Sequence, residues 1–310
     1  MILVTGASGT LGKRLIPALR GTAQPLRAIV RDPHRSTHLD GVEIVQGDVR
    51  DQDVLRRAVA GTDVVVSAMS GFGAAGEVSV ESVDRDGNRG LVAASRAAGV
   101  KHIVLVSAIE AAPDHPMDLM KAKFAAEQAV KESGMDWTII RPTLSTETWG
   151  DMLGRPLLKH GKTTVYGRGN QRVNFVSARD VAELVVLAVT DPALRGVALE
   201  IGGPENLTMN EFVAEFQAET GAAGDAAHYP LLVMRLLAPG LRHVKQQMAR
   251  HVQAGVYIDT HGLAFDGPAA RRTYPAVPVT SVADVFRADY APAVNLPRTS
   301  PSCHSGSPSR

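Results

Sequence analysis

The strongest constraint on the fold is a short apolar segment, residues 2–5, that runs directly into a turn with glycine at every third position: Gly6, Gly9 and Gly12. A helical segment, residues 13–20, follows at once. Glycine allows the backbone to turn tightly and lets another group approach it closely. A strand, a glycine turn and a helix in this order are typical of the start of a parallel α/β sheet.

The following residues repeat this alternation of strand and helix. Apolar segments of strand length occupy residues 2–5, 26–30, 42–46, 64–68, 103–107 and 137–140. Between them lie segments with helical periodicity, one of which begins after Asp51 and ends before Gly61. Buried parallel strands joined by helices predict an α/β fold with a doubly wound parallel sheet of the Rossmann type.

The second half is less regular and predicts a small C-terminal substrate lobe. Two helix starts are marked by Ser177 with Asp180 and by Thr208 with Glu211. The densely apolar residues 230–241 predict a helix packed on the core, in preference to one lying on a membrane surface. We expect a coenzyme-binding core at 1–148 and 173–201, a substrate lobe at 149–172 and 202–291, and a disordered tail at 292–310.

Composition excludes several classes of partner. The formal net charge is +1 and no long basic run is present, so we expect no nucleic-acid partner. The single cysteine, Cys303, excludes an internal disulfide, and the ten histidines show no spacing typical of a metal site. With no secretory leader and no membrane-spanning stretch expected, the prediction is a cytoplasmic monomer or homodimer that acts on a small molecule.

The glycine turn also predicts a ligand. Its amides at the start of a helix suit the pyrophosphate of a dinucleotide. The predicted contacts are Gly6, Ser8, Gly9, Thr10, Leu11 and Gly12. Arg31, directly after the second predicted strand and with Arg35 nearby, suits a ribose 2′-phosphate and therefore favours NADP(H). The alternative is a solvated Arg31, with Asp32 binding the ribose of NAD(H).

The spacing Gly-x-x-Gly-x-x-Gly resembles that of the short-chain dehydrogenase/reductase superfamily. Further segments share the resemblance, and the later ones are similar to its atypical, NmrA-like branch. They are Gly47-Asp48-Val49, Val83-Asp84 through Gly87-Asn88, Gly134 through Arg141-Pro142, Asn174-Phe175-Val176 leading to Asp180-Val181-Ala182, and Ile201-Gly202-Gly203 with Leu207-Thr208. The resemblance extends from Met1 to about residue 216.

This resemblance implies roles for individual residues. Coenzyme contacts are implied for Asp48, Val49, Ser67, Ala68 and Pro142. Lys123 aligns with the lysine that holds the nicotinamide ribose, and Ser107 with the catalytic serine. The tyrosine that donates a proton is replaced by Leu119, or by Met117 if Lys121 is the aligned lysine. Neither residue can donate a proton.

Other side chains are candidates for the missing acid. His115 and Asp118 precede the helix that carries Lys123, and either can serve as a general acid if its pKa is suitable. Tyr166 and Tyr257, from the second lobe, are further candidates.

We therefore expect an NADPH-dependent reductase of a small lipophilic carbonyl, quinone or enone. An apolar lobe supports a lipophilic substrate, and its predicted lining includes Leu231, Leu232, Met234 and Leu236. The alternative is a non-catalytic NADP(H)-binding regulator or assembly protein, favoured by the missing tyrosine. A sugar-nucleotide epimerase or dehydratase ranks lower, with Arg168, Arg172 and Arg242 as the only hints of a diphosphate site.

Overall fold

The computed structural model describes residues 1–33, 37–73, 78–231 and 246–291. Its central sheet is parallel and has the strand order β10-β6-β5-β4-β1-β2-β3. The strands are β1 (Ile2–Thr5), β2 (Leu26–Val30), β3 (Glu43–Gln46), β4 (Val64–Ser67), β5 (His102–Val106), β6 (Asp136–Pro142) and β10 (Val197–Ile201). This α/β arrangement confirms the predicted doubly wound sheet.

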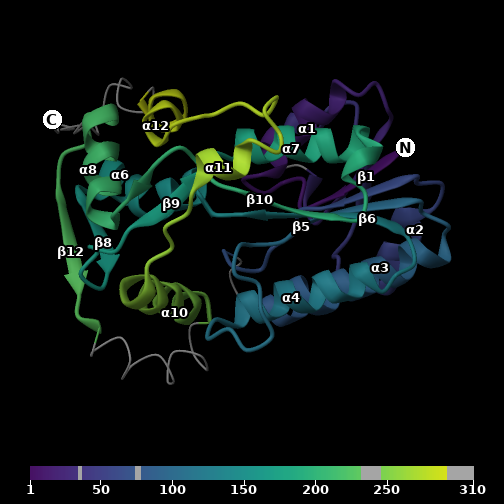
Figure 1. The fold of residues 1–310 in the computed structure, drawn as a ribbon, viewed down its shortest axis with the longest axis horizontal. Helices are drawn as coiled ribbons and strands as arrows, with labels where there is room; N and C mark the ends of the chain where they lie inside the picture. Colours follow the sequence, from purple (N-terminus) through teal and green to yellow (C-terminus); the bar gives the residue numbers. More distant parts are fainter. Residues whose placement is uncertain (34–36, 74–77, 232–245, 292–310) are drawn as a thin grey trace, which may run out of the picture.

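Helices cover both faces of the sheet (Figure 1). One face carries α1 (Gly12–Arg20) and α7 (Ala178–Thr190), and the other carries α2 (Gln52–Val59), α3 (Asn88–Ala97) and α4 (Asp118–Lys131). A π-helical turn, η3 (Glu81–Gly87), leads into α3. Two hydrophobic clusters fill the spaces between the helix layers and the sheet, because buried parallel strands are apolar on both sides.

Short elements between and after the last strands of the sheet form the second lobe. They comprise a small sheet of β7 (Leu144–Ser145), β9 (Val173–Val176) and β11 (Asn206–Leu207), and a pair of β8 (Lys162–Tyr166) and β12 (Asp225–Tyr229). The helices are α5 (Thr146–Trp149), η4 (Gly150–Gly154), α6 (Arg155–His160), α8 (Met209–Thr220), α10 (Gln246–His261), α11 (Gly267–Arg271) and α12 (Val282–Asp289). Single 3₁₀ turns span Thr37–Leu39 and Pro192–Leu194.

The predicted helix starts in this half are present. Thr208 accepts a hydrogen bond from the amide of Glu211, whose side chain accepts one in return from the amide of Thr208. Ser177 caps α7 by accepting from the amide of Arg179. Most of the apolar segment 230–241 lies outside the described residues. Among the helices that the structure describes, none has both the length and the apolar character needed to cross a bilayer.

Helix α10 packs against the loops that follow β4 and β5 (Figure 1). Arg250 donates to the carbonyl oxygens of Phe72 and Val78, each at 3.1 Å. Gln253 donates to the carbonyl of Pro116 at 3.0 Å. The second lobe therefore adjoins the carboxyl edge of the sheet, the edge at which ligands bind in open α/β folds.

Candidate functional site

The glycine turn follows β1 at the edge of the sheet that carries the carboxyl ends of the strands. Here β1 has β2 on one side and β4 on the other, so the chain builds the sheet outward in opposite directions from this point. Gly6 has a φ of +77°, and a Cβ at this position would collide with the carbonyl of Ala68. A Cβ at Gly12 would collide with the carbonyl of Ala7. Gly9 differs, because the nearest atom to an added Cβ is the carbonyl oxygen of Gly6 at 3.3 Å. Gly6 and Gly12 are thus required by the fold, whereas a Cβ at Gly9 would make one tight contact that a small shift can relieve.

The first turn of α1 is suited to an anion. Its N-cap, Leu11, provides no side-chain hydrogen bond, and the first turn contains no acidic residue. The first amides of a helix have no partner within the helix and attract negative charge. Ser8 and Gly9 are exposed, and Thr10 is half-buried. The turn and the helix together therefore fit the pyrophosphate of a dinucleotide.

A pair of arginines lies where β2 and β3 end. Arg31 is exposed directly after β2. Arg50 makes two hydrogen bonds to Asp48, at 2.9 and 3.0 Å, and these hold the pKa of Asp48 below its usual range, with Arg31 contributing further. The sequence alone did not identify Arg50, although its place two residues after Asp48 was a usable signal. Arg35 lies outside the described residues.

Other predicted coenzyme contacts have different surroundings. The Ser67 hydroxyl is buried and donates to Asn88 at 2.6 Å, so its side chain is already used within the protein. Ala68 is half-buried, and its carbonyl faces the glycine turn. Val49 packs on the α2–α3 side of the core. Pro142 is half-buried at the end of β6 and accepts a hydrogen bond from the amide of Ile109.

Lys123 is buried, and its ammonium is directed to protein groups. It donates to the carbonyls of Met69 and Val106, both at 3.1 Å, and lies 3.0 Å from Oδ1 of the buried Asp84. Asp84 in turn accepts from the amide of Gly71 at 2.7 Å. Lys123 thus makes two hydrogen bonds and one ion-pair contact, all to protein groups. Lys123 therefore ties the ends of β4 and β5 to η3 at the edge where the coenzyme is expected.

The predicted serine belongs to another buried network. The Ser107 hydroxyl donates to Oε1 of Glu127 at 2.6 Å. Arg141 binds the same carboxylate with two hydrogen bonds, at 2.9 and 2.6 Å. The sequence alone did not identify Glu127 as a site residue. The network ties α4 to β5 and β6.

The loop between β5 and α4 carries the two candidate acids. Asp118 begins α4 and lies 3.9 Å from Lys121. His115 is buried, and burial holds its pKa below the usual value. Leu119, one residue after Asp118, packs against an apolar cluster formed by Met117, Met120 and Ala254.

Of the two tyrosines considered, Tyr257 reaches this edge. It lies on α10, packs against the same cluster as Leu119, and donates a hydrogen bond to Glu110 at 3.0 Å. Tyr166 lies in β8, where its ring stacks on that of Tyr229.

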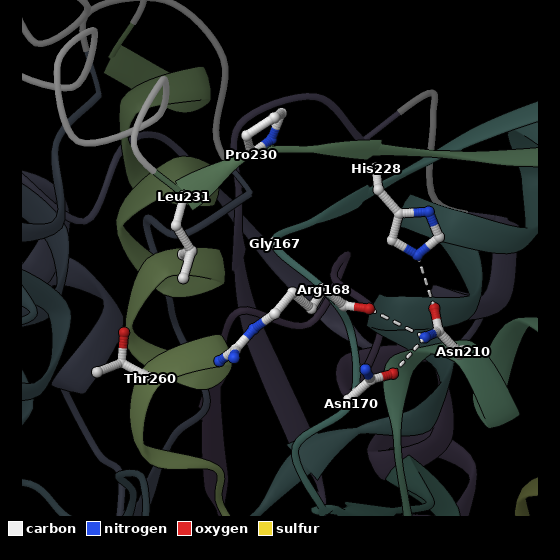
Figure 2. Close-up of a pocket in the computed structure, with 8 residues that line it drawn as sticks. All are labelled: Gly167, Arg168, Asn170, Asn210, His228, Pro230, Leu231 and Thr260. Carbon is white, nitrogen blue, oxygen red and sulfur yellow. Dashed lines mark hydrogen bonds between the residues drawn. The ribbon is translucent and has the colours of Figure 1, made fainter.

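A separate hollow of about 860 Å³ lies in the second lobe (Figure 2). Its lining residues are Gly167, Arg168, Asn170, Asn210, His228, Pro230, Leu231 and Thr260. Figure 2 shows His228 bonded to Asn210, whose amide donates to Asn170 and to the carbonyl of Arg168. Of the predicted apolar lining, Leu231 is present here, whereas Leu232, Met234 and Leu236 lie outside the described residues.

The arginines that hinted at a diphosphate site are bound to carboxylates. Arg168 contacts Asp259 at 3.2 Å, and Arg172 contacts Glu211 at 2.7 Å. Arg242 lies outside the described part of the chain.

Comparisons with known proteins agree with this geometry. The family model described as NAD(P)H-binding matches residues 6–192. The NAD(P)H azoreductase of Xenophilus azovorans is 31% identical over 225 residues, which are 71% of this chain and 74% of the relative. The (4-alkanoyl-5-oxo-2,5-dihydrofuran-3-yl)methyl phosphate reductase of Streptomyces griseus is 34% identical, with 71% and 74% covered. The crystal structure of an NADPH-dependent quinone oxidoreductase from Escherichia coli, complexed with NADPH, has a TM-score of 0.73 and 23% identity, covering 92% of this chain and 98% of the other.

Proposed function

The chain belongs to the NAD(P)H-binding family, and we propose that it is an NADPH-dependent reductase of a small lipophilic carbonyl, quinone or enone. When bound, the reduced nicotinamide supplies a hydride. In the proposed complex, the glycine turn and the amides of α1 hold the pyrophosphate. Arg31 and Arg50 bind the 2′-phosphate, which distinguishes NADPH from NADH. Lys123 keeps the loops after β4 and β5 in place.

The observation that carries this proposal is an apolar wall beside the expected nicotinamide position. Met117, Met120 and Ala254 form a buried cluster, and Phe72 and Leu119 pack against it. These residues come from the loop after β4, from the start of α4 and its N-cap residue, and from α10. Apolar walls with few polar groups are typical of sites for small organic ligands. A flat conjugated carbonyl suits such a wall better than a charged sugar nucleotide.

Similarity to relatives named as reductases supports the same reaction class. The two curated relatives described above are an azoreductase and a reductase of a phosphorylated furanone. The pairing of Arg168 and Arg172 with carboxylates further supports the low rank of a sugar-nucleotide enzyme.

The test is steady-state oxidation of NADPH with a panel of quinones, enones and aromatic aldehydes, followed by the absorbance of the reduced nicotinamide. Turnover should rise with the apolar surface of the acceptor. Phe72→Ser should raise KM for the largest acceptors while NADPH affinity stays constant. NADPH binding without turnover on any acceptor would contradict the proposal.

A non-catalytic NADP(H)-binding regulator or assembly protein is the second candidate. It is favoured by Leu119, an apolar residue where the resemblance places the proton-donating tyrosine. Loss of a general acid removes roughly a 10²- to 10⁴-fold rate contribution but leaves coenzyme binding intact. This candidate predicts NADPH binding with no turnover, so the same assay separates the two.

The division into a coenzyme core and a substrate lobe is also part of the proposal. It assigns residues 1–148 and 173–201 to the core, and 149–172 and 202–291 to the lobe. Strand β9 pairs with β7 and β11 outside the central sheet, so this strand joins the two parts. We propose a cytoplasmic monomer or homodimer, consistent with the single cysteine.

A further inference from the structure

Three polar side chains, two from the loop after β5 and one from the distant helix α10, meet beside the apolar wall. Tyr257, on α10, donates to Oε2 of Glu110 at 3.0 Å. The same carboxylate oxygen lies 3.8 Å from Nε2 of His115. The rings of His115 and Tyr257 are tilted against each other, with centroids 4.5 Å apart. Glu110 and His115 both belong to the loop after β5.

Glu110 has an unusual backbone conformation. Its φ is +61°, in the left-handed region that residues other than glycine rarely occupy. Such strain persists only where surrounding structure enforces it, and it concentrates at functional sites. The preceding residue, Ile109, donates its amide to the carbonyl of Pro142, which fixes the loop to the end of β6. The strained conformation presents the Glu110 carboxylate to Tyr257.

The hydrogen bonds define the protonation of the cluster. Nδ1 of His115 accepts from the amide of Met117 at 3.0 Å, so the neutral ring carries its hydrogen on Nε2, which faces Glu110. Burial lowers the pKa of His115 and favours this neutral form. Burial, with the neighbouring Glu110, raises the pKa of Tyr257 to about 12, so the phenol keeps its proton at neutral pH. The other ring in contact with Tyr257 is that of His261, stacked at 4.6 Å.

The location suits a role in the proposed reaction. Tyr257, Leu119 and Ala108 all pack against the Met117–Met120–Ala254 cluster, and Ala108 directly follows Ser107 at the end of β5. A reductase of a carbonyl must supply a proton to the substrate oxygen. Leu119 has no proton to give, and the Lys123 ammonium is buried, donates to two main-chain carbonyls and is paired with Asp84. The Tyr257 hydroxyl is exposed, and its one proton can turn from Glu110 to a substrate oxygen with the loss of a single hydrogen bond.

We propose that Tyr257 is the proton donor for a carbonyl substrate, with Glu110 and His115 as positioning residues. This inference rests on the proposed reductase function. The carbonyl carbon accepts the hydride supplied by the bound coenzyme, the π electron pair of the C=O bond moves to the oxygen, and that oxygen takes the proton from Tyr257 Oη. The carbonyl is reduced to an alcohol and the coenzyme is oxidised. The resulting phenolate regains a proton from solvent.

The proposal selects a substrate class within the proposed function. A phenol of high pKa donates favourably only to a more basic oxygen, such as the alkoxide formed from an aldehyde or ketone. The carboxylate of Glu110 orients the hydroxyl and keeps it protonated. Aldehydes and ketones therefore depend on Tyr257, whereas an acceptor that needs no proton does not.

The test compares Tyr257→Phe with Tyr229→Phe, which removes the hydroxyl of an exposed tyrosine in β12. Each variant is assayed with an aromatic aldehyde and with a triarylmethyl cation, a dye that accepts a hydride without a proton. Tyr257→Phe should lower kcat for the aldehyde by about 10²- to 10⁴-fold and change kcat for the dye less than about twofold. Tyr229→Phe should change neither.

A second measurement uses no coenzyme. The ultraviolet absorbance of tyrosinate is titrated in the wild-type protein, in Tyr257→Phe and in Glu110→Gln. Glu110→Gln should make one tyrosine ionise at lower pH, and the double variant with Tyr257→Phe should lose that transition. A transition that survives in the double variant would overturn the assigned contact.

The outcomes separate this inference from the proposed function. A wild-type protein that binds NADPH but reduces no acceptor refutes the reductase. An active wild-type protein whose Tyr257→Phe variant reduces the aldehyde normally refutes only the role of Tyr257. Equal losses with aldehyde and dye would show that Tyr257 supports the fold of the site and donates no proton.

Discussion

The buried ammonium of Lys123 lies 3.0 Å from a carboxylate oxygen of the fully buried Asp84, so α4 and η3 are joined by an ion pair shielded from water. The same ammonium holds the main chain at the ends of β4 and β5. Lys121, two positions earlier, has a side chain that is 47% exposed. Residues two apart on a helix point in directions about 200° different, which explains why only one lysine faces the sheet.

Lys123→Ala should destabilise the protein by about 3–5 kcal/mol, because it leaves the charge of Asp84 buried without a partner. It should also weaken NADPH binding several-fold and slow reduction, since the loops that position the nicotinamide lose their anchor. Lys121→Ala should change stability by less than about 0.5 kcal/mol. Urea unfolding and calorimetric titration of NADPH measure both effects. A larger loss of NADPH affinity in Lys121→Ala would show that the alignment of α4 is wrong, with Met117 as the position of the lost tyrosine.

NADPH should bind at least about tenfold more tightly than NADH, because a charge-assisted contact to the 2′-phosphate contributes roughly 1.5–3 kcal/mol. Arg31→Ala and Arg50→Ala should each reduce the difference in affinity between NADPH and NADH without unfolding the protein. Arg57→Ala, at an exposed position on α2, is the matched control and should leave it unchanged. Calorimetry with both coenzymes provides the measurement. Equal affinities in the unmutated protein would contradict the preference for NADPH.

Gly9→Val should abolish binding of both coenzymes, because a branched side chain would stand where the pyrophosphate must approach the backbone. The fold should survive, since the one tight contact of a new Cβ, at 3.3 Å from the carbonyl oxygen of Gly6, needs a shift of only a few tenths of an ångström. Gly12→Ala should instead destabilise the protein, because its Cβ would collide with the carbonyl of Ala7. Thermal unfolding followed by circular dichroism, with NADPH titration, distinguishes the two effects. Normal NADPH binding by a folded Gly9→Val protein would make the turn purely structural.

Acidification should lower stability because buried histidines resist protonation. Burial lowers the pKa values of His102, His115 and His251, with Arg195 contributing at His102 and Arg250 at His251. Below the unfolded pKa of about 6.5, the unfolded chain binds protons that the folded chain does not, so stability present above that pH is lost as the pH falls. Each of these histidines can change the free energy of unfolding by up to about 1.4 kcal/mol per pH unit.

Urea unfolding between about pH 7 and pH 5 measures this slope. His102→Gln should make the pH dependence of the unfolding free energy shallower, because it removes one of these three protonation sites and leaves His115 and His251 in place. A slope that is the same in His102→Gln and the unmutated protein would contradict the assignment to His102.

The central sheet was largely predictable from the sequence, because buried parallel strands are continuous apolar runs bounded by turn residues. The strand predicted at 137–140 is observed as Asp136–Pro142. The prediction was too short because the charged side chains of Asp136 and Arg141 lie at the ends of the strand and break the apolar pattern. Similarly, the segment from Val83 to Asn88 was singled out by the resemblance, but its π-helical conformation at Glu81–Gly87 was not predicted.

The contacts within the site were harder to predict. The importance of Lys123 was implied by the family resemblance, whereas its partner Asp84 lies 39 positions earlier and is brought near only by the packing of η3 against α4. The approach of Tyr257 to Glu110 depends on how α10 docks, which local periodicity does not encode. The strained conformation of Glu110 has no sequence pattern of its own, whereas the pairing of Arg50 with Asp48, two residues earlier, could have been predicted.

Helix α10 is fastened to the neighbouring loops through their main-chain carbonyls, at Phe72, Val78 and Pro116. Every amino acid supplies a carbonyl, so these attachments persist when the loop side chains are exchanged. At Phe72 both the backbone and the ring contact α10, because the ring lies 5.4 Å from that of His251. Exchanging this side chain would therefore remove one ring contact while the three carbonyl attachments of the helix stay in place.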